Sequence, residues 1–165
     1  MRIYNMKDEY IAFLKQYDAK VPDNKNQQRP YVGVVLEIEG IKYYAPLSSP
    51  KIKHTKMKNA KDFRKINQGI YGAINFNNMI PVCETALVHV DIPNIEDEQY
   101  RRLLQNQYKY IRRDETKIRE TAENLHTLIF TADEQLSECD KRIKKRCCNL
   151  SLLESVINLY DMSKE

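Results

Sequence analysis

The sequence predicts an α+β fold, in which a small, strongly twisted antiparallel β-barrel lies between an N-terminal helix and a group of C-terminal helices. Two observations support this fold class. Apolar residues alternate with a period of two in several short stretches between residues 29 and 92, and from Asn94 onward the period becomes helical. We expect one domain over residues 1–165, with a β-barrel core at about 29–92 and a helical part at about 94–162.

The N-terminal segment from Asn5 to Ala19 is expected to form a helix, because apolar side chains recur there at helical spacing. The members of this apolar face are Met6, Tyr10, Phe13, Leu14 and Tyr17. The helix is expected to end at Val21-Pro22-Asp23, and the polar stretch DNKNQQ that begins at Asp23 reads as a loop.

The stretch RPYVGVVLEIEGIKYYAPL is predicted to form a β-hairpin. Val32, Val34, Leu36 and Ile38 alternate on the first strand, and Ile41, Tyr43, Ala45 and Leu47 alternate on the second. Glu39-Gly40 forms the expected turn, because glycine adopts the positive φ that such turns need. We therefore place a strand directly before Ser48-Ser49-Pro50.

A second hairpin is predicted in GIYGAINFNNMIPV, with Asn77-Asn78 as its turn. A further strand, ALVHVDI, ends at Pro93, and the alternation in this strand makes His89 a structural residue. The basic segment 48–68 between the two hairpins is compatible with a short irregular helix whose limits the pattern does not fix.

The C-terminal part begins at Asn94, which forms a capping-box-like start with Asp97. A long charged helix follows, either continuous or broken near Asp114, and 131–138 is expected to be a loop. The stretch CDKRIKKRCC is expected to form one or two basic helical turns, and Asn149 or Ser151 to cap a last helix.

Composition argues against several classes of protein. No run of about 18 apolar residues is present, so no transmembrane helix is expected. The N-terminus lacks the apolar region of a secretory signal, and none of the four cysteines forms a C-x-x-C pair. We therefore expect a cytoplasmic protein whose cysteines are reduced.

Positive charge is concentrated in the segment from Ile41 to Ile70. Eight Lys and Arg residues and one acid, Asp62, give the segment a net charge of +7, whereas the whole chain carries +4. A block of this sign indicates a polyanionic partner, and a solvated loop is the alternative interpretation.

The segment lacks the residues of several phosphate chemistries, because the chain has no Gly-rich phosphate loop, no H-E-x-x-H and no acidic or His cluster at metal-ligand spacing. RNA offers a metal-free route, since its own 2′-OH can attack the adjacent phosphate. Cations and hydroxyl donors then stabilise the added negative charge. The residues of this kind near the loop are Arg29, Ser48, Ser49, Lys51 and His54.

The runs RPYVGVVLEIEGIKYYAPLSSPKIKH, GAINFNNMIPV and KIKKRCCNLSLLE closely resemble the ToxN/AbiQ/CptN family, the toxins of type III toxin–antitoxin systems. The resemblance extends nearly over the whole chain. The family is similar in fold to the MazF and Kid toxins, which are small SH3-like β-barrels. In that wider group, an Arg-Pro opens one strand and an AP-[IL]-[ST]-S segment ends a nearby one, as Arg29-Pro30 and Ala45 to Ser49 do here.

The resemblance implies a metal-independent endoribonuclease without cofactors. It would cut single-stranded RNA, leave 2′,3′-cyclic phosphate ends, and act in phage abortive infection. The implied partner is an RNA antitoxin of tandem pseudoknot repeats, which the toxin would process. Toxin and RNA would alternate in a closed assembly of about three copies each. Neither DNA nor a membrane is an implied partner.

The resemblance also ranks the site residues. Ser49 matches the serine that is central to activity in the family, as a hydrogen-bond donor or proton relay and not as a covalent nucleophile. Ser48, Lys51 and Arg29 complete the expected catalytic set. Tyr31 is a candidate for the tyrosine that the family uses near this strand.

Further residues are expected to contact RNA, by stacking on bases, by reading base edges or by pairing with phosphates. They are Tyr44, Lys53, His54, Lys56, Lys58, Lys61, Lys65, Asn75, Asn77, Lys144, Lys145 and Arg146. Two other functions stay open at this point. A non-catalytic RNA-binding module would use the same basic loop, and a protein-targeting toxin like the gyrase poison CcdB would share the barrel.

Overall fold

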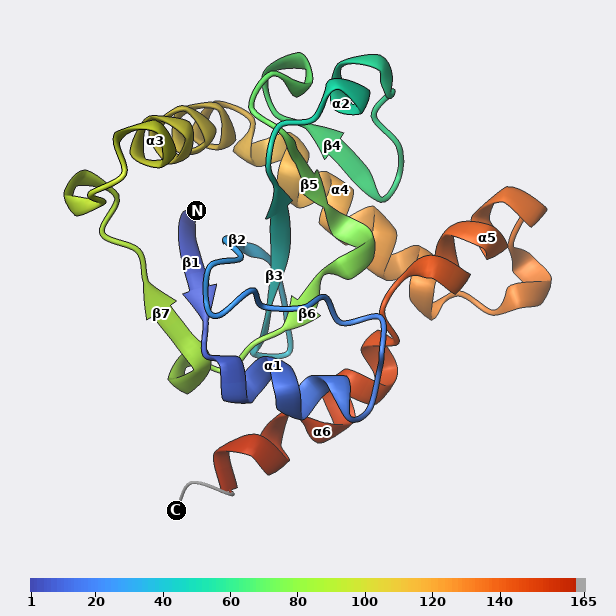
Figure 1. Cartoon of the computed structure of the whole chain (residues 1–165). Helices are drawn as coiled ribbons and strands as arrows, with labels where there is room; N and C mark the ends of the chain where they lie inside the picture. Colours follow the sequence, from blue (N-terminus) through green and yellow to red (C-terminus); the bar gives the residue numbers. More distant parts are fainter. Residues whose placement is uncertain (163–165) are drawn as a thin grey trace.

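A seven-stranded antiparallel sheet forms the centre of the computed structural model, which describes residues 1–162 (Figure 1). The last three residues of the predicted 1–165 domain lie outside the described residues. The strands are β1 (Arg2–Met6), β2 (Tyr31–Ile38), β3 (Ile41–Ser48), β4 (Phe63–Lys65), β5 (Ala73–Asn75), β6 (Ile80–Pro81) and β7 (Leu87–His89). The helices are α1 (Asp8–Lys15), α2 (Ile52–Lys56), α3 (Glu98–Arg113), α4 (Glu115–Phe130), α5 (Glu138–Arg146) and α6 (Leu150–Met162).

The sheet is open, so the prediction of a closed barrel is wrong. Its strands follow the order β4-β5-β3-β2-β1-β7, and β6 pairs with β3 beside this path. Within the described residues, β4 and β7 lie at opposite ends and do not pair with each other. The α+β class is confirmed, with the C-terminal helices packed around an antiparallel sheet. The likeness to MazF and Kid stays a prediction.

The central strand β3 uses both of its edges for pairing. One edge pairs with β2, and the Glu39-Gly40 turn between them has positive φ at both residues, 51° and 81°, which confirms the predicted first hairpin. The alternation predicted for β2 is interrupted, because the register shifts between Gly33 and Leu36. Leu36 is buried, whereas Ile38, which pairs with Ile41 beside the turn, lies at the surface.

The other edge of β3 pairs with two short strands, so the predicted second hairpin is wrong. Tyr43 and Tyr44 pair with β6, whereas Leu47 and Ser48 pair with β5. Between β5 and β6 the chain forms a 3₁₀ turn over Phe76–Asn78, with Phe76 buried. Asn77 and Asn78 thus connect two strands that lie end to end along β3.

The N-terminal helix begins later than its apolar spacing predicts. Arg2–Met6 forms β1, which pairs with β2 on one side and with β7 on the other. Lys7 is extended, and α1 runs only over Asp8–Lys15. The helix prediction is wrong for residues 5–7, because pairing between distant strands overrides a local helical pattern at Asn5 and Met6, and for residues 16–19, which form turns after the helix.

The first C-terminal helix begins three residues later than the predicted start at Asn94, which instead ends a 3₁₀ turn, whereas the predicted break at Asp114 is confirmed. The Asp97 carboxylate caps α3 by accepting a hydrogen bond from the Tyr100 N–H (2.8 Å). Asp114, with φ −103° and ψ 10°, separates α3 from α4. The segment 131–138 contains a 3₁₀ turn, Asp133–Gln135, and Asn149 caps α6 through the Leu152 N–H (3.2 Å).

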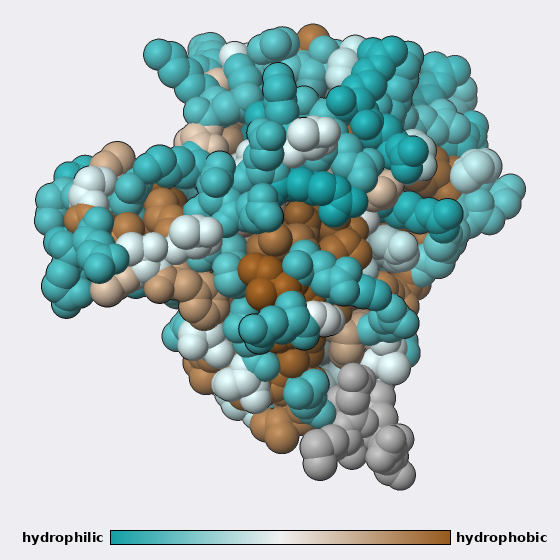
Figure 2. Space-filling view, turned by 180° about the vertical axis from the view of Figure 1, so that it is seen from behind, coloured by the Kyte–Doolittle hydropathy of each residue, from teal (hydrophilic) through white to brown (hydrophobic). Residues whose placement is uncertain are grey.

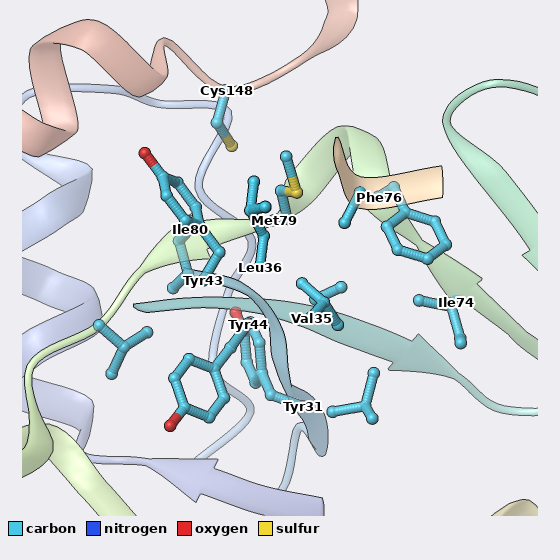
Figure 3. Close-up of a cluster of buried hydrophobic side chains, with 14 of the residues drawn as sticks. Tyr31, Val35, Leu36, Tyr43, Tyr44, Ile74, Phe76, Met79, Ile80 and Cys148 are labelled. Atoms are coloured by element: carbon cyan, nitrogen blue, oxygen red, sulfur yellow. The ribbon is translucent and has the colours of Figure 1, made fainter. Parts of the chain in front are cut away.

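The core gathers aromatic and aliphatic side chains from β2, β3, β5 and β6 (Figure 3). Helix α4 packs against β2, and α6 packs against β6 and α1, where the rings of Tyr10 and Tyr160 meet at 4.8 Å. All four cysteines are free thiols, and Cys147 and Cys148 are buried. Burial raises the pKa of both buried thiols to about 12, so neither is a reactive thiolate at neutral pH.

The rear face of the molecule is strongly hydrophilic toward the top, and apolar side chains gather in its middle (Figure 2). Among residues 1–162, no helix combines the length and the apolar character that crossing a bilayer would require.

The end of β3 is fixed by an unusually close backbone approach. Gly72 has φ +87°, and a Cβ atom placed on it would lie 1.9 Å from the carbonyl oxygen of Ser48. Gly69 has φ +91°, and a Cβ atom placed on it would lie 2.5 Å from the carbonyl oxygen of His54. The loop between β4 and β5 therefore supports the segment 48–54 at both of its ends. Only glycine fits at positions 69 and 72.

Gly72→Ala is expected to lower the free energy of unfolding by more than Gly40→Ala does. Both positions have positive φ, which costs an alanine about 1–2 kcal/mol. Nothing lies within 4 Å of the Cβ position at Gly40, whereas at Gly72 the Ser48 backbone must move. Urea unfolding of the two variants measures the difference. Equal losses of stability would show that the approach at Ser48 is not a constraint.

Candidate active site

The two predicted serines lie where β3 ends and the basic loop begins. Ser48 is the last residue of β3 and pairs with Ala73. Its Oγ accepts a hydrogen bond from the Asn75 amide, so its own hydroxyl hydrogen is available for another acceptor. Ser49 is exposed next to Pro50, and Lys51 precedes the short helix α2. The strand therefore presents one oriented and one exposed hydroxyl.

Arg29 is brought to the same place by the start of β2. The Leu47 N–H donates to the Pro30 carbonyl at 2.8 Å, which holds Arg29-Pro30 beside the end of β3. The Arg29 Nε donates to the Asp23 carbonyl at 2.6 Å, and the guanidinium is partly exposed. Neither Arg29 nor Lys51 takes part in an ion pair between the described residues.

A left-handed turn before Arg29 sets its position. Lys25, Asn26 and Gln27 have φ of 52°, 55° and 60°, although none of them is glycine. Such conformations cost roughly 1–2 kcal/mol per residue, and strain of this kind often accompanies functional sites. The buried Asn24 compensates by donating to the carbonyl of Met6 and to the Asp8 carboxylate, both at 2.7 Å. The sequence predicted only a polar loop here.

The four predicted catalytic residues line one pocket of about 200 Å³, which we call the serine pocket. Its lining residues are Lys25, Gln28, Arg29, Pro30, Leu47, Ser48, Ser49, Lys51, Tyr100, Leu103 and Gln107. Three of them are cations and none is acidic. The pocket therefore suits an anionic group that can accept hydrogen bonds from hydroxyls.

A second hollow of about 450 Å³, the basic hollow, adjoins the serine pocket and shares Ser48 and Lys51 with it. Its lining residues are Ser48, Lys51, Lys53, His54, Met57, Lys58, Ala60, Asp62, Phe63, Asn75, Asn77, Asn78 and Arg146. The one acidic lining residue, Asp62, is buried and accepts two hydrogen bonds from Arg146, at 2.6 and 2.8 Å. This ion pair joins α5 to the hollow.

His54 lies inside the structure and not on the surface of the basic loop. Its side chain is 2% exposed and packs against Phe63, with ring centroids 5.9 Å apart. Burial lowers the pKa of the imidazole, and the charges of Lys53 and Lys51 lower it further. His54 is therefore neutral at pH 7, which corrects the expectation of a charged phosphate contact on the loop surface.

Tyr31 and Tyr44 are also buried, with 0% and 3% exposure. Tyr44 packs edge-on against Tyr4, and burial raises its pKa to about 12. Neither ring presents a face to solvent, so the expected stacking of Tyr44 and the expected role of Tyr31 at the RNA are not supported. Both residues of the Tyr43-Tyr44 pair belong to the core, because the register shift in β2 allows burial on both faces of the hairpin.

The predicted RNA-binding lysines between residues 53 and 65 fall into three groups. Lys53 and Lys58 line the basic hollow, and Lys56 is exposed on α2 beside them. Lys61 pairs with Asp140 at 2.7 Å. Lys65 lies instead in a separate groove, next to Arg64 and Lys117.

The basic residues of α5 line two different surface hollows. Arg146 lines the basic hollow, whereas Lys144 and Lys145 line another surface hollow beside Phe130. The Lys144 ammonium donates to Asp133 at 2.7 Å and to the Thr131 carbonyl at 2.8 Å. Lys144 and Lys145 are therefore not brought together with the serines.

Asn75 and Asn77 both line the basic hollow. Both were expected to read base edges, but the hydrogen bonds that they make differ from this expectation. The Asn75 amide is engaged with Ser48, so it orients a hydroxyl. The backbone of Asn77 donates to the Asp62 carbonyl (3.2 Å) and accepts from the Cys148 N–H (2.9 Å). Its side chain remains a candidate for contact with RNA.

Sequence reasoning missed the part of the serine pocket that α3 supplies. Tyr100, Leu103 and Gln107 lie on one face of this helix and line the pocket. Their spacing of three and four residues was the available signal, because it places them on one side of a helix. No local pattern indicates that this side faces the end of β3.

The model of the family described as "Toxin ToxN, type III toxin-antitoxin system" matches residues 2–158. The chain is 34% identical to Endoribonuclease ToxN of Pectobacterium atrosepticum, with 100% of this chain and 95% of that protein covered. It is 30% identical to Endoribonuclease AbiQ of Lactococcus lactis subsp. lactis, with 97% of this chain and 89% of that protein covered.

Two solved structures share the fold over nearly their full length. One comes from work on selective toxin inhibition by a non-coding RNA pseudoknot in type III systems. It has a TM-score of 0.85 and 30% identity, and covers 97% of both chains. The other is AbiQ, a lactococcal anti-phage endoribonuclease, with a TM-score of 0.80 and 28% identity, covering 99% of this chain and 98% of that one. The chain therefore belongs to the ToxN family of type III toxin–antitoxin systems.

Proposed function

We propose that this protein is an endoribonuclease toxin of a type III toxin–antitoxin system and cleaves single-stranded RNA in the serine pocket. The observation that carries the proposal is the meeting of Ser48, Ser49, Lys51 and Arg29 in one pocket without an acidic residue. The relatives named above are endoribonucleases, and AbiQ is described as anti-phage. The protein would act on RNA in the cytoplasm, during phage infection.

The reaction follows from the charges and donors of the pocket. The 2′-oxygen of the RNA forms a bond to the adjacent phosphorus, and the bond from phosphorus to the 5′-oxygen breaks. The proton of the 2′-OH is removed, and the leaving 5′-oxygen takes up a proton, so the products are a 2′,3′-cyclic phosphate and a 5′-hydroxyl. The step needs alignment and stabilisation of the extra negative charge on phosphorus.

Each pocket residue fits one of these needs. Arg29 is permanently charged and can hold two phosphate oxygens at once, and Lys51 adds a compact charge on the opposite chain segment. The exposed Ser49 hydroxyl donates to a non-bridging oxygen or relays a proton. Ser48, held through the Asn75 amide, keeps its hydroxyl hydrogen for the phosphate. None of these roles requires a metal ion.

The basic hollow gives the RNA a path away from the serine pocket. Lys53, Lys58 and Arg146 line it, and it shares Ser48 and Lys51 with the pocket. One strand that crosses from pocket to hollow would pass over both serines. The same surface would bind the RNA antitoxin, whose repeats the toxin would process and then hold in a closed assembly of about three toxins and three RNAs.

Ser49→Ala and Lys51→Ala are each expected to lower RNA cleavage about 100-fold or more, because each removes a group that stabilises the charged transition state. Lys109→Ala is the control, since Lys109 is exposed on α3 and lines neither the serine pocket nor the basic hollow. Cleavage of a labelled RNA by the purified variants measures the effect. Wild-type rates in both serine-pocket variants would refute the proposed site.

Cleavage is expected to persist in excess EDTA. The described residues contain no group of three or more His, Cys, Asp or Glu side chains that could hold a metal ion, and the pocket supplies its own cations. The same cleavage assay with and without EDTA tests this. Complete loss of activity in EDTA that added Mg²⁺ restores would contradict the metal-free route.

A further inference from the structure

Gln107 is a buried polar residue in the wall of the serine pocket. It lies on α3, its side chain is 1% exposed, and it lines the pocket together with Ser48, Ser49 and Lys51. Helix interiors seldom bury glutamine without a polar partner for each end of the amide. Its burial in the pocket wall therefore indicates which chemical groups the pocket can bind.

The two ends of the Gln107 amide differ. The Nε2 group donates to the Tyr71 carbonyl at 2.9 Å, which fixes the orientation of the amide. The Oε1 atom is buried and has no hydrogen-bond partner among the described residues. An acceptor left in this state costs about 1–3 kcal/mol, and a ligand that donates a hydrogen bond to it would remove that cost.

A phosphate group cannot donate a hydrogen bond to Gln107 Oε1, because the phosphate oxygens are themselves acceptors. The donors of RNA are the ribose 2′-OH and the nitrogen groups of the bases. The Gln107 side of the pocket favours a base, since Leu47, Leu103 and Tyr100 line the same pocket and provide apolar and aromatic surface. Recognition of single-stranded RNA commonly places an unstacked base on such a surface.

We propose that the serine pocket holds one nucleobase next to the scissile phosphate, and that Gln107 Oε1 accepts a hydrogen bond from its exocyclic amino group. The inference rests on the proposed RNA cleavage and adds a specificity-determining residue to it. Gln107 selects bases that carry an amino group over uracil, whose corresponding edge presents a carbonyl oxygen. The hydrogen bond from Nε2 to the Tyr71 carbonyl keeps Oε1 oriented as the acceptor for the base.

The test compares an RNA with a single wild-type cleavage site and the same RNA in which the amino group of one flanking base is replaced by hydrogen. Wild-type protein is expected to cleave the amino-bearing RNA about tenfold faster at one flanking position. Gln107→Met, which fills similar space without an acceptor, is expected to cleave both RNAs at equal rates.

Gln105→Met is the matched control, because Gln105 is exposed on the same helix and lies outside the serine pocket. It is expected to keep the wild-type ratio. A structural role alone would lower both rates in Gln107→Met and leave their ratio unchanged, and that result would overturn the inference. So would a wild-type ratio of one at every flanking position. Absence of cleavage of either RNA by the wild type would instead refute the proposed function itself.

Discussion

The close approach of Gly72 to the Ser48 carbonyl is the contact on which the site depends. A Cβ atom at Gly72 would lie 1.9 Å from that oxygen, so the two backbones meet without any side chain between them. The loop after β4 thereby supports the end of β3 from one side, while the Leu47–Pro30 hydrogen bond fixes it to the Arg29 segment on the other. The end of the strand is held by backbone contacts, and the Asn75 amide donates to the Ser48 Oγ while the Ser48 hydroxyl hydrogen stays available.

The ion pairs distinguish the cations that support the fold from those that are proposed to bind RNA. Lys61 pairs with Asp140, Lys144 pairs with Asp133, and Arg146 pairs with Asp62, so these charges are partly neutralised. Arg29 and Lys51 have no such partner among the described residues and line a pocket without acids. In the proposed function, Arg29 and Lys51 would supply the charge that faces the phosphate, and the surrounding basic surface would guide the strand.

Local sequence signals predicted the first hairpin, the break at Asp114, the cap at Asn149 and the loop that carries the serines. They failed where distant segments decide the structure. The end of β1, Asn5 and Met6, was included in the predicted helix because its pairing with β7 is invisible in a local pattern. The sheet is open because β4 and β7 do not meet. For the site, the family resemblance ranked Arg29, Ser48, Ser49 and Lys51, which the fold brings together. The contribution of α3 needed the structure, since Gln107 is far from the serines along the chain.

Attack by the 2′-OH of the RNA, in a pocket of hydroxyls and cations, is the central claim of this account. The direct measurement is cleavage of an RNA that carries a single 2′-deoxynucleotide on the 5′ side of the mapped cleavage site. We expect complete protection of that one bond, with normal cleavage of an otherwise identical RNA whose 2′-deoxynucleotide lies several positions away. Cleavage of the deoxy-substituted bond at the wild-type rate would contradict the account, because water or a protein group would then be the nucleophile.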